Sequence, residues 1–325
     1  MTIIDAPPGY APLENDVPWD PGYLELAPPE QVLMLDELGL EAAGLTALSP
    51  VAITSPFRLL SDQGIRVMHA VCTELERFAG GNSRIAKCAR GGVYRSVFLR
   101  GMSADPDLLE FLGDLAQAPI ERHPVGHHAM HVNYAPDELG KNVDQWHCDA
   151  VSFDYVLMVS DPRGRKGGRF EYFLGSVEEG RDLLLAGSGL PSQRVVSVEF
   201  PGPGWAVFQQ GHRVLHRATR LEEPAERITA VASFYTPDPV ISDPTEIRTL
   251  RGADGSEIAL VEWSRYASVV AARRLLHFAD EGASFARSHR ELQADLRACI
   301  AVVEEAIEEF DREDQGGLIT FGEGE

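Results

Sequence analysis

The sequence predicts a mainly β protein with flanking helices, of the α+β class, whose strands close into a jelly roll. The first observation is a series of short runs between residues 129 and 235 that are rich in Val, Phe, Tyr and Trp. The second is that Gly and Pro turns, such as those at 161–164 and 201–204, separate these runs. Short strands at regular spacing are typical of a sandwich or barrel, and helical patterns precede and follow them.

The N-terminal part is expected to supply an arm and helices that pack on the jelly roll. Residues 1–60 are assigned to an arm and a first helix, because 1–28 are rich in Pro, Gly and acidic residues. Ser61 is a suitable N-cap for a helix with an apolar face. Asp105 and Pro106 form an N-cap followed by proline at the first helical position, which marks another helix start.

Residues 61–240 are assigned to the jelly-roll domain with its supporting helices. One helix is expected to interrupt the strands, because Ser176 and Glu179 have the spacing of a capping box ahead of Leu183–Leu185. Eight strands are expected, at 129–135, 145–150, 153–160, 168–174, 194–200, 204–210, 213–219 and 226–235.

Residues 241–325 are assigned to a C-terminal helical extension of the same single domain. After residue 256 the pattern is helical to about 311 and is expected to form a helical pair. An apolar stripe recurs at three- and four-residue spacing along its end: Leu292, Leu296, Cys299, Val303, Ile307 and Phe310. Packing within the chain is the expected role of this stripe, and a homodimer interface is the alternative.

Composition excludes some classes of function and indicates a location. The formal net charge of −21 argues against a nucleic-acid-binding protein that relies on a basic face. The N-terminus lacks the basic and apolar regions of a signal peptide, and no apolar run approaches the ~20 residues that span a bilayer. The four cysteines show no paired metal spacing. A cytoplasmic protein with reduced thiols and no membrane partner is expected.

The residues with metal chemistry begin with His147 and Asp149, two positions apart on the strand expected at 145–150. Side chains at i and i+2 of a strand share a face, so the imidazole and the carboxylate would project together into the pocket. Cys148 would point the other way and is interpreted as a packing residue. A triplet of this kind is common by chance and needs a third ligand from elsewhere.

His216, on the strand expected at 213–219, is the candidate third ligand. Two histidines and one carboxylate on one face of an octahedral metal leave three positions open, an arrangement suited to Fe(II) oxygen chemistry. Zinc more often has thiolates or a third histidine. His212 is an alternative for the distal position, but it lies in an expected turn, and His216 is favoured.

This pattern resembles the Fe(II)- and 2-oxoglutarate-dependent oxygenases, a family with the double-stranded β-helix (jelly-roll) fold. The family pattern is His-x-Asp, a distal His some tens of residues later, and an Arg about ten residues beyond it. The matching residues are His147, Asp149, His216 and, eleven residues later, Arg227. The likeness covers residues 121–240 well and the flanks poorly. It implies Fe(II), 2-oxoglutarate and O2 as the cofactor, co-substrate and oxidant.

The resemblance also implies roles for residues that hold the co-substrate. The family's Arg binds the far carboxylate of 2-oxoglutarate, often with a hydroxyl two residues on, and Arg227 and Thr229 match that pair. The alternative for Arg227 is a surface residue of an edge strand. Asn133 is a further co-substrate contact, or else it satisfies neighbouring backbone groups.

Three other residues are candidate substrate contacts: His131, which would share a strand face with Asn133; Arg95, in a run that would reach over the barrel mouth; and Asp144, three residues before His147. The alternatives are an ordinary surface ion pair for Arg95 and a turn cap for Asp144. Histidines also crowd 123–131, but their spacing matches no known metal cluster.

The expected activity is hydroxylation of an unactivated C–H bond in a free small molecule, an amino acid or derivative, with release of succinate and CO2. Asp149 stands where halogenating relatives have Gly or Ala, so halogenation is not expected. One alternative is a jelly-roll protein that binds a small molecule without catalysis, and another is a cupin-like metal dioxygenase that does not use 2-oxoglutarate. The balance of 26 Arg to three Lys is typical of a GC-rich bacterial source, which fits secondary metabolism.

Overall fold

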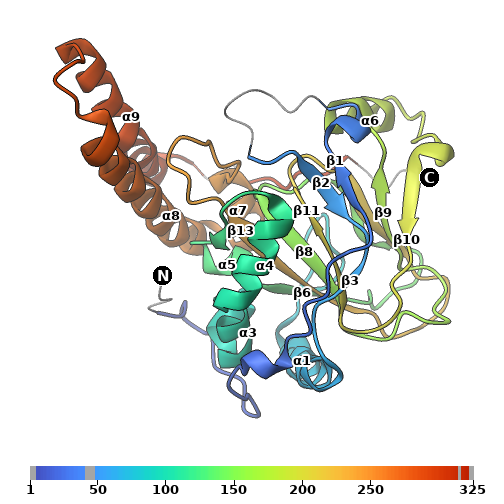
Figure 1. Cartoon of the computed structure of the whole chain (residues 1–325). Coiled ribbons are helices and arrows are strands. Elements are labelled where there is room, and N and C mark those ends of the chain that lie inside the picture. The colour runs from blue at the N-terminus through green and yellow to red at the C-terminus, as the bar shows by residue number, and fades with distance from the viewer. Residues whose placement is uncertain (1–4, 41–47, 314–315, 322–325) are drawn as a thin grey trace.

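The computed structural model describes residues 5–40, 48–313 and 316–321 (Figure 1). Its thirteen strands are β1 (Val32–Met34), β2 (Val51–Thr54), β3 (Phe57–Arg58), β4 (Cys88–Ala89), β5 (Glu121–Arg122), β6 (His131–Tyr134), β7 (Asn142–His147), β8 (Phe153–Met158), β9 (Phe170–Phe173), β10 (Val195–Val198), β11 (Trp205–Gln209), β12 (His216–Arg220) and β13 (Ile228–Tyr235). Its α-helices are α1 (Asp62–Leu75), α2 (Gly92–Arg95), α3 (Val97–Met102), α4 (Pro106–Ala116), α5 (Gly126–Ala129), α6 (Val177–Leu185), α7 (Ile247–Asp254), α8 (Ser256–His277) and α9 (His289–Glu308).

Eight consecutive strands, β6 to β13, divide between two facing antiparallel sheets and form the expected jelly roll, the double-stranded β-helix. The larger sheet has the order β1-β2-β11-β8-β13-β6-β4, and outside this order β3 pairs with β11 and β5 with β13. The smaller sheet has the order β10-β9-β12-β7. Strands therefore alternate between sheets along much of the chain, and the expected fold class is confirmed.

Strand alternation separates two cores on opposite faces of the larger sheet. On the outer face, alternate residues of β8, β11 and β13, such as Phe153, Phe208 and Phe234, pack with apolar side chains of α1, α3 and α4. On the inner face, residues such as Val156, Val207 and Val231 fill part of the space between the sheets. Because side chains alternate across a strand, the remaining inward positions can carry the polar groups described below.

Most helix starts follow from their caps. The Ser61 hydroxyl accepts a hydrogen bond from Gly64 N at the start of α1, and Asp105 accepts from the first turn of α4. Ser176 caps α6 by accepting from Glu179 N, but the Glu179 carboxylate pairs with Arg194 instead of completing the expected capping box.

The N-terminal part differs from the expected arm and helix. Within the described part of residues 1–60, the structure has the strands β1, β2 and β3 and only short 3-10 turns, and β2 pairs with both β1 and β11. The run Val51–Thr54 is buried at every position. An apolar run of four residues is too short for a helix and suits a buried strand, so the larger sheet extends beyond the boundary expected at residue 61.

The C-terminal pair is present as α8 and α9, which form a hairpin that projects away from the sheets in Figure 1. Only part of the expected apolar stripe is covered. Cys299 is buried, whereas Leu296, Ile307 and Phe310 are 44%, 62% and 58% exposed. Packing within the chain therefore accounts for only part of the stripe. Among the described residues, no helix combines the length and apolar character needed to cross a membrane.

Candidate metal centre

His147, Asp149 and His216 meet at one end of the smaller sheet. His147 is the last residue of β7, His216 is the first of β12, and the two are paired across the sheet. Asp149 does not lie on the strand expected at 145–150, because β7 ends at His147. The following loop carries Asp149 back to the site, where its backbone N donates to Gly211 O at 3.0 Å.

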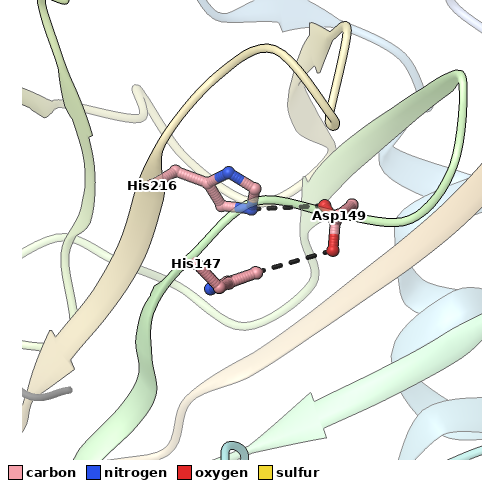
Figure 2. A group of neighbouring side chains, drawn as sticks. All are labelled: His147, Asp149 and His216. Carbon is pink, nitrogen blue, oxygen red and sulfur yellow. Dashed lines mark ion pairs between the residues drawn. The ribbon is translucent and has the colours of Figure 1, made fainter. Parts of the chain in front are cut away.

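The two histidines are oriented by their backbones. His147 Nδ1 lies 2.6 Å from Gln145 O, and His216 Nδ1 lies 2.9 Å from Val214 O. Because a carbonyl only accepts, each Nδ1 carries a proton, which leaves Nε2 as the nitrogen of each ring that can bind a metal. His147 Nε2 lies 3.6 Å and His216 Nε2 lies 3.3 Å from oxygens of Asp149 (Figure 2).

This donor set fits a divalent transition metal. One ligand atom from each residue lies within 4.8 Å of the others, and no other group of His, Cys, Asp or Glu in the described part of the chain meets this criterion. Burial and Arg84 hold the pKa of His147 well below its usual value. Burial opposes ionisation of Asp149, but His216 and His147 outweigh it and lower the pKa of this carboxyl. A neutral imidazole and an ionised carboxylate are the forms that bind metals.

His212 and Cys148 stay outside this group. His212 lies in the turn before β12, as expected, and burial lowers its pKa to about 4. The Cys148 thiol is buried, and burial raises its pKa to about 12. A thiol of high pKa is a poor metal ligand, because the thiolate is the binding form.

Arg227 enters the same cavity from the larger sheet, just before β13. It is buried, its Nε donates to Gly168 O at 2.9 Å, and its Nη1 donates to Thr229 Oγ1 at 3.2 Å. No carboxylate among the described residues forms an ion pair with Arg227. Burial and nearby Arg165 lower its pKa to about 9, and the attraction of Asp144 offsets only part of this effect.

Gly168 and the pairing of Thr229 with Asn133 position the side chains around Arg227. Gly168 has φ of +64°, and a Cβ there would lie 3.0 Å from Arg227 Cδ. Glycine at this position therefore leaves room for the Arg227 side chain. Thr229 pairs with Asn133 across β13 and β6, and both line the cavity. Asn133 Oδ1 is buried without a hydrogen-bond partner. The backbone-satisfying role considered for Asn133 is therefore not seen for this oxygen.

The structure brings two of the three candidate substrate contacts to the cavity. His131 and Asp144 line it together with the metal-centre residues, and the cavity has a volume of about 30 Å³ between the sheets. Burial lowers the pKa of His131 to about 3 and raises that of Asp144 to about 6.

Arg95 is not at this cavity. Its guanidinium lies over the rings of Phe78 and Tyr10, at 3.8 and 4.2 Å from their centroids, and donates to Ala11 O. Tyr10 and Phe78 thus hold Arg95 by cation–π contacts, which residue spacing does not indicate. Arg84 is the arginine that lines the cavity near Asp144 and Asp149.

Asp154 is a second residue that the sequence reasoning missed. It lies on the inner face of β8 and lines the cavity, where Gln209 Nε2 of β11 donates to its Oδ1 at 3.0 Å. A Cβ on Gly211 would clash with Asp154 Oδ2 and lie 3.0 Å from Asp149. The acid inside the apolar run Phe153–Met158 could have indicated this residue in the sequence, because an acidic side chain is rarely buried in a strand unless it has a partner.

The histidines at 123–131 are distributed among other partners. His127 Nδ1 lies 2.8 Å from Glu262, and His123 Nε2 lies 2.9 Å from Thr245 Oγ1. They contribute no second metal group among the described residues.

Comparison with known proteins gives only distant matches. No protein-family model and no curated protein sequence matches the chain. The α-ketoglutarate-dependent epimerase SnoN from nogalamycin biosynthesis is 15% identical, over 57% of this chain and 78% of its own, with a TM-score of 0.44. HygX from Streptomyces hygroscopicus, solved with nickel and 2-oxoglutarate, is 13% identical over 57% and 83%, with a TM-score of 0.41.

A prolyl-4-hydroxylase from Pseudomonas putida is 14% identical over 62% of this chain and 97% of its own, with a TM-score of 0.40. The chain resembles the Fe(II)/2-oxoglutarate oxygenases. The likeness lies in the two-sheet topology of this chain and in its His-Asp-His group.

Proposed function

We propose that the protein is a non-haem Fe(II)/2-oxoglutarate-dependent oxygenase that hydroxylates an unactivated C–H bond of a free small molecule, an amino acid or derivative. One observation carries the proposal: a buried arginine without a counter-ion shares a cavity with two histidines and a carboxylate. Burying an unpaired cation costs free energy, so Arg227 is expected to have an anionic ligand.

The metal ligands would be His147, Asp149 and His216, and 2-oxoglutarate would be held by Arg227 with Thr229 and Asn133. Fe(II) with O2 and 2-oxoglutarate supplies an oxidant that hydroxylates C–H bonds while succinate and CO2 leave. The chain's own residues orient the reactants. The Gln145 and Val214 carbonyls fix the two imidazoles, and Thr229 fixes the planar guanidinium for two-pronged binding of a carboxylate.

The cavity disfavours both alternative functions. A non-catalytic binding protein has no need for two imidazoles aimed at one carboxylate. A cupin-like dioxygenase that uses O2 alone has no need for Arg227 and Thr229 beside the metal centre. The carboxylate of Asp149 also argues against halogenation, in which its position would be vacated for a halide.

A small free substrate is part of this proposal, as are bacterial secondary metabolism and a homodimer. The cavity lies between the two sheets and shares Arg84 with a pocket of about 470 Å³, a size suited to a small molecule. The exposed apolar residues Leu296, Ile307 and Phe310 support pairing of two copies through the C-terminal helices. Light scattering of the purified protein checks the dimer, and a monomeric mass would contradict it.

The test of the activity is anaerobic titration with Fe(II) and 2-oxoglutarate, followed by visible absorption. The chelate of the two gives a weak charge-transfer band, which we expect in the native protein and not in Arg227→Ala. The control is Arg163→Ala, which removes an exposed arginine paired with Asp161 and should keep the band. A folded native protein without a band would favour the binding-protein alternative, and turnover retained in Arg227→Ala would favour the dioxygenase.

A further inference from the structure

Arg84 lies where the metal cavity meets the neighbouring pocket. The Asn82 side chain accepts hydrogen bonds from the backbone N of Arg84 and Ile85, at 2.9 and 2.8 Å. Ile85 in turn bridges Asp144 on the edge of β7. These contacts fix the backbone of the loop beside the metal-binding strand. The Arg84 side chain lines both the metal cavity and the pocket of about 470 Å³, which we call the outer pocket.

The outer pocket is polar and borders the smaller sheet. Its remaining lining residues come from the Arg84 loop, the segment leading into β7 and β7 itself, and include Asn82, Glu138, Lys141 and Gln145. Arg84 is the residue that this lining shares with the metal cavity. A molecule held in the outer pocket that reaches the metal centre would therefore pass its guanidinium.

The ion pairs of Arg84 are poorly formed. Nε lies 3.2 Å from Asp144 Oδ1, and Nη1 lies 3.6 Å from Asp149 Oδ1. Both Arg84 Nε and Asp144 Oδ1 are nevertheless buried without a hydrogen-bond partner. Arg90 provides the contrast within this chain, because its Nε and Nη2 donate to Asp254 at 2.7 and 2.8 Å. Arg84 is close to acids without the two-pronged geometry that an arginine–carboxylate pair prefers.

Other cationic side chains beside these cavities form better ion pairs or hydrogen bonds than Arg84 does. Lys141 lies 3.0 Å from Glu138 on the surface, and Arg217 donates to Glu171 at 2.9 Å. Arg227 is fixed by Gly168 and Thr229. In the proposed function Asp149 also serves as a metal ligand, which leaves Asp144 as the acid beside Arg84. Arg84 is thus the cation placed to receive a ligand from the outer pocket.

We propose that Arg84 binds an oxyanion of the substrate, a carboxylate or a phosphate, and so selects anionic substrates. The guanidinium would hold this group at the boundary while the rest of the substrate lies toward the metal centre. A neutral substrate would leave the buried Nε unsatisfied, which costs binding free energy. The proposal rests on the proposed function for the chemistry that follows binding, whereas oxyanion binding itself belongs to Arg84.

The test is calorimetric binding of three small probes to the whole chain with Ni(II) and excess 2-oxoglutarate present, so that Arg227 is already occupied. The probes are inorganic phosphate, N-acetylglycine and its neutral amide, N-acetylglycinamide. We expect one oxyanion to bind at least about tenfold more tightly than the amide, as charge-assisted hydrogen bonds require. Which of the two binds identifies the oxyanion as phosphate or carboxylate.

Variants assign the preference to Arg84. Arg84→Gln should abolish it, and Arg84→Lys, which keeps the charge and serves if the first variant unfolds, should retain part of it. The control Arg66→Gln, at an exposed position of α1, should leave it unchanged. Equal binding of all three probes by the native protein would overturn the proposal, as would a preference that survives in Arg84→Gln. A role of Arg84 only in orienting Asp149 would instead appear as weaker Ni(II) binding without any oxyanion preference.

The two proposals fail separately. If the Fe(II)/2-oxoglutarate titration gives no band, the proposed function fails whatever the probes show. If the band forms and the probes bind without an oxyanion preference, only the role of Arg84 fails.

Discussion

Two buried polar regions of this protein contrast in how their charges are paired. In the first, Glu262 of α8 accepts from Tyr94 at 2.5 Å, from His127 at 2.8 Å, from Arg265 at 3.0 Å and from Gly126 N at 3.1 Å. In the second, the metal cavity, five lining residues have a buried polar atom without a partner: Arg84, His131, Asn133, Asp144 and Asp154.

The difference separates polar residues that hold the fold together from those available to a ligand. Burial opposes ionisation of Glu262, yet its hydrogen bonds to His127 and Tyr94 lower its pKa, so this charge is stabilised inside the fold. Unsatisfied buried groups cost free energy and persist where function retains them. Substitutions around Glu262 should therefore mainly lower stability, whereas substitutions in the metal cavity should mainly weaken ligand binding.

The largest expected effect comes from removing a metal ligand. In Asp149→Ala, Co(II) affinity should fall more than about 100-fold, because loss of an outer-sphere partner of a metal ligand already costs about 10–100-fold. The unfolding free energy of the metal-free protein should fall by a smaller factor than the Co(II) affinity, because the substitution removes the attraction of Asp149 to His147 and His216 but also the cost of burying a carboxylate. Co(II) titration and urea unfolding measure the two quantities. Asp161→Ala, at an exposed position, is the control. Unchanged Co(II) affinity in Asp149→Ala would mean that Asp149 does not bind the metal.

Arg227→Met tests whether this arginine of the cavity serves ligand binding and not stability. We expect 2-oxoglutarate affinity to fall about 100-fold, since truncating one partner of a buried charged pair costs about 2–5 kcal/mol. In the absence of ligand, stability should stay constant or rise by about 1 kcal/mol, because an unpaired buried cation is replaced by an apolar chain. Calorimetry and urea unfolding report these values. A clear loss of stability would mean that Arg227 is structural.

Glu262→Gln is the converse experiment. It should lower the free energy of unfolding by about 3 kcal/mol, because His127 and Arg265 lose their buried counter-charge. Co(II) affinity should stay within about twofold, since Glu262 does not line the metal cavity. Glu257→Gln, exposed on the same helix, is the matched control for both measurements. A large change in Co(II) affinity would show that the two regions are coupled.

The last expected effect is a pH dependence near the Glu262 cluster, which is smaller per pH unit than the change in stability expected for Glu262→Gln. Burial lowers the pKa of His123 to about 4, so between pH ~6.5 and ~4 the unfolded chain binds a proton that the folded chain does not. The contribution of this neutral imidazole to stability is thus present above its unfolded pKa and is lost as the pH falls, by up to about 1.4 kcal/mol per pH unit. Urea unfolding across this range should give a shallower slope for His123→Gln. Equal slopes would mean that His123 does not titrate in this way.

The sequence predicted local features whose physical signals are short in range. Ser61 and Asp105 cap helices as expected, because a cap depends on a few neighbouring residues. The strands of the jelly roll were predicted to within a few residues by their β-branched and aromatic runs. Asp149 differed in an instructive way, since it reaches His147 through a loop and not along a strand face.

Other features depend on contacts between distant segments. Neither the cation–π packing of Arg95 nor the position of Arg84 beside Asp144 has a periodic pattern in the sequence, because each partner lies far along the chain or in a loop. The short strand Val51–Thr54 was missed for a related reason, since its place in the sheet depends on pairing with β11.

His147, Asp149, His216 and Arg227 could be proposed as site residues from the chain alone, because their residue types suit a metal and a dicarboxylate and their spacing resembles that of the oxygenase family. Their convergence was decided by the tertiary structure, which sets His216 opposite His147 across two strands and turns Arg227 into the same cavity. The same folding left Glu262 fully paired and Arg84 poorly paired. The pairing of a charge depends on packing in three dimensions, and no local pattern encodes it.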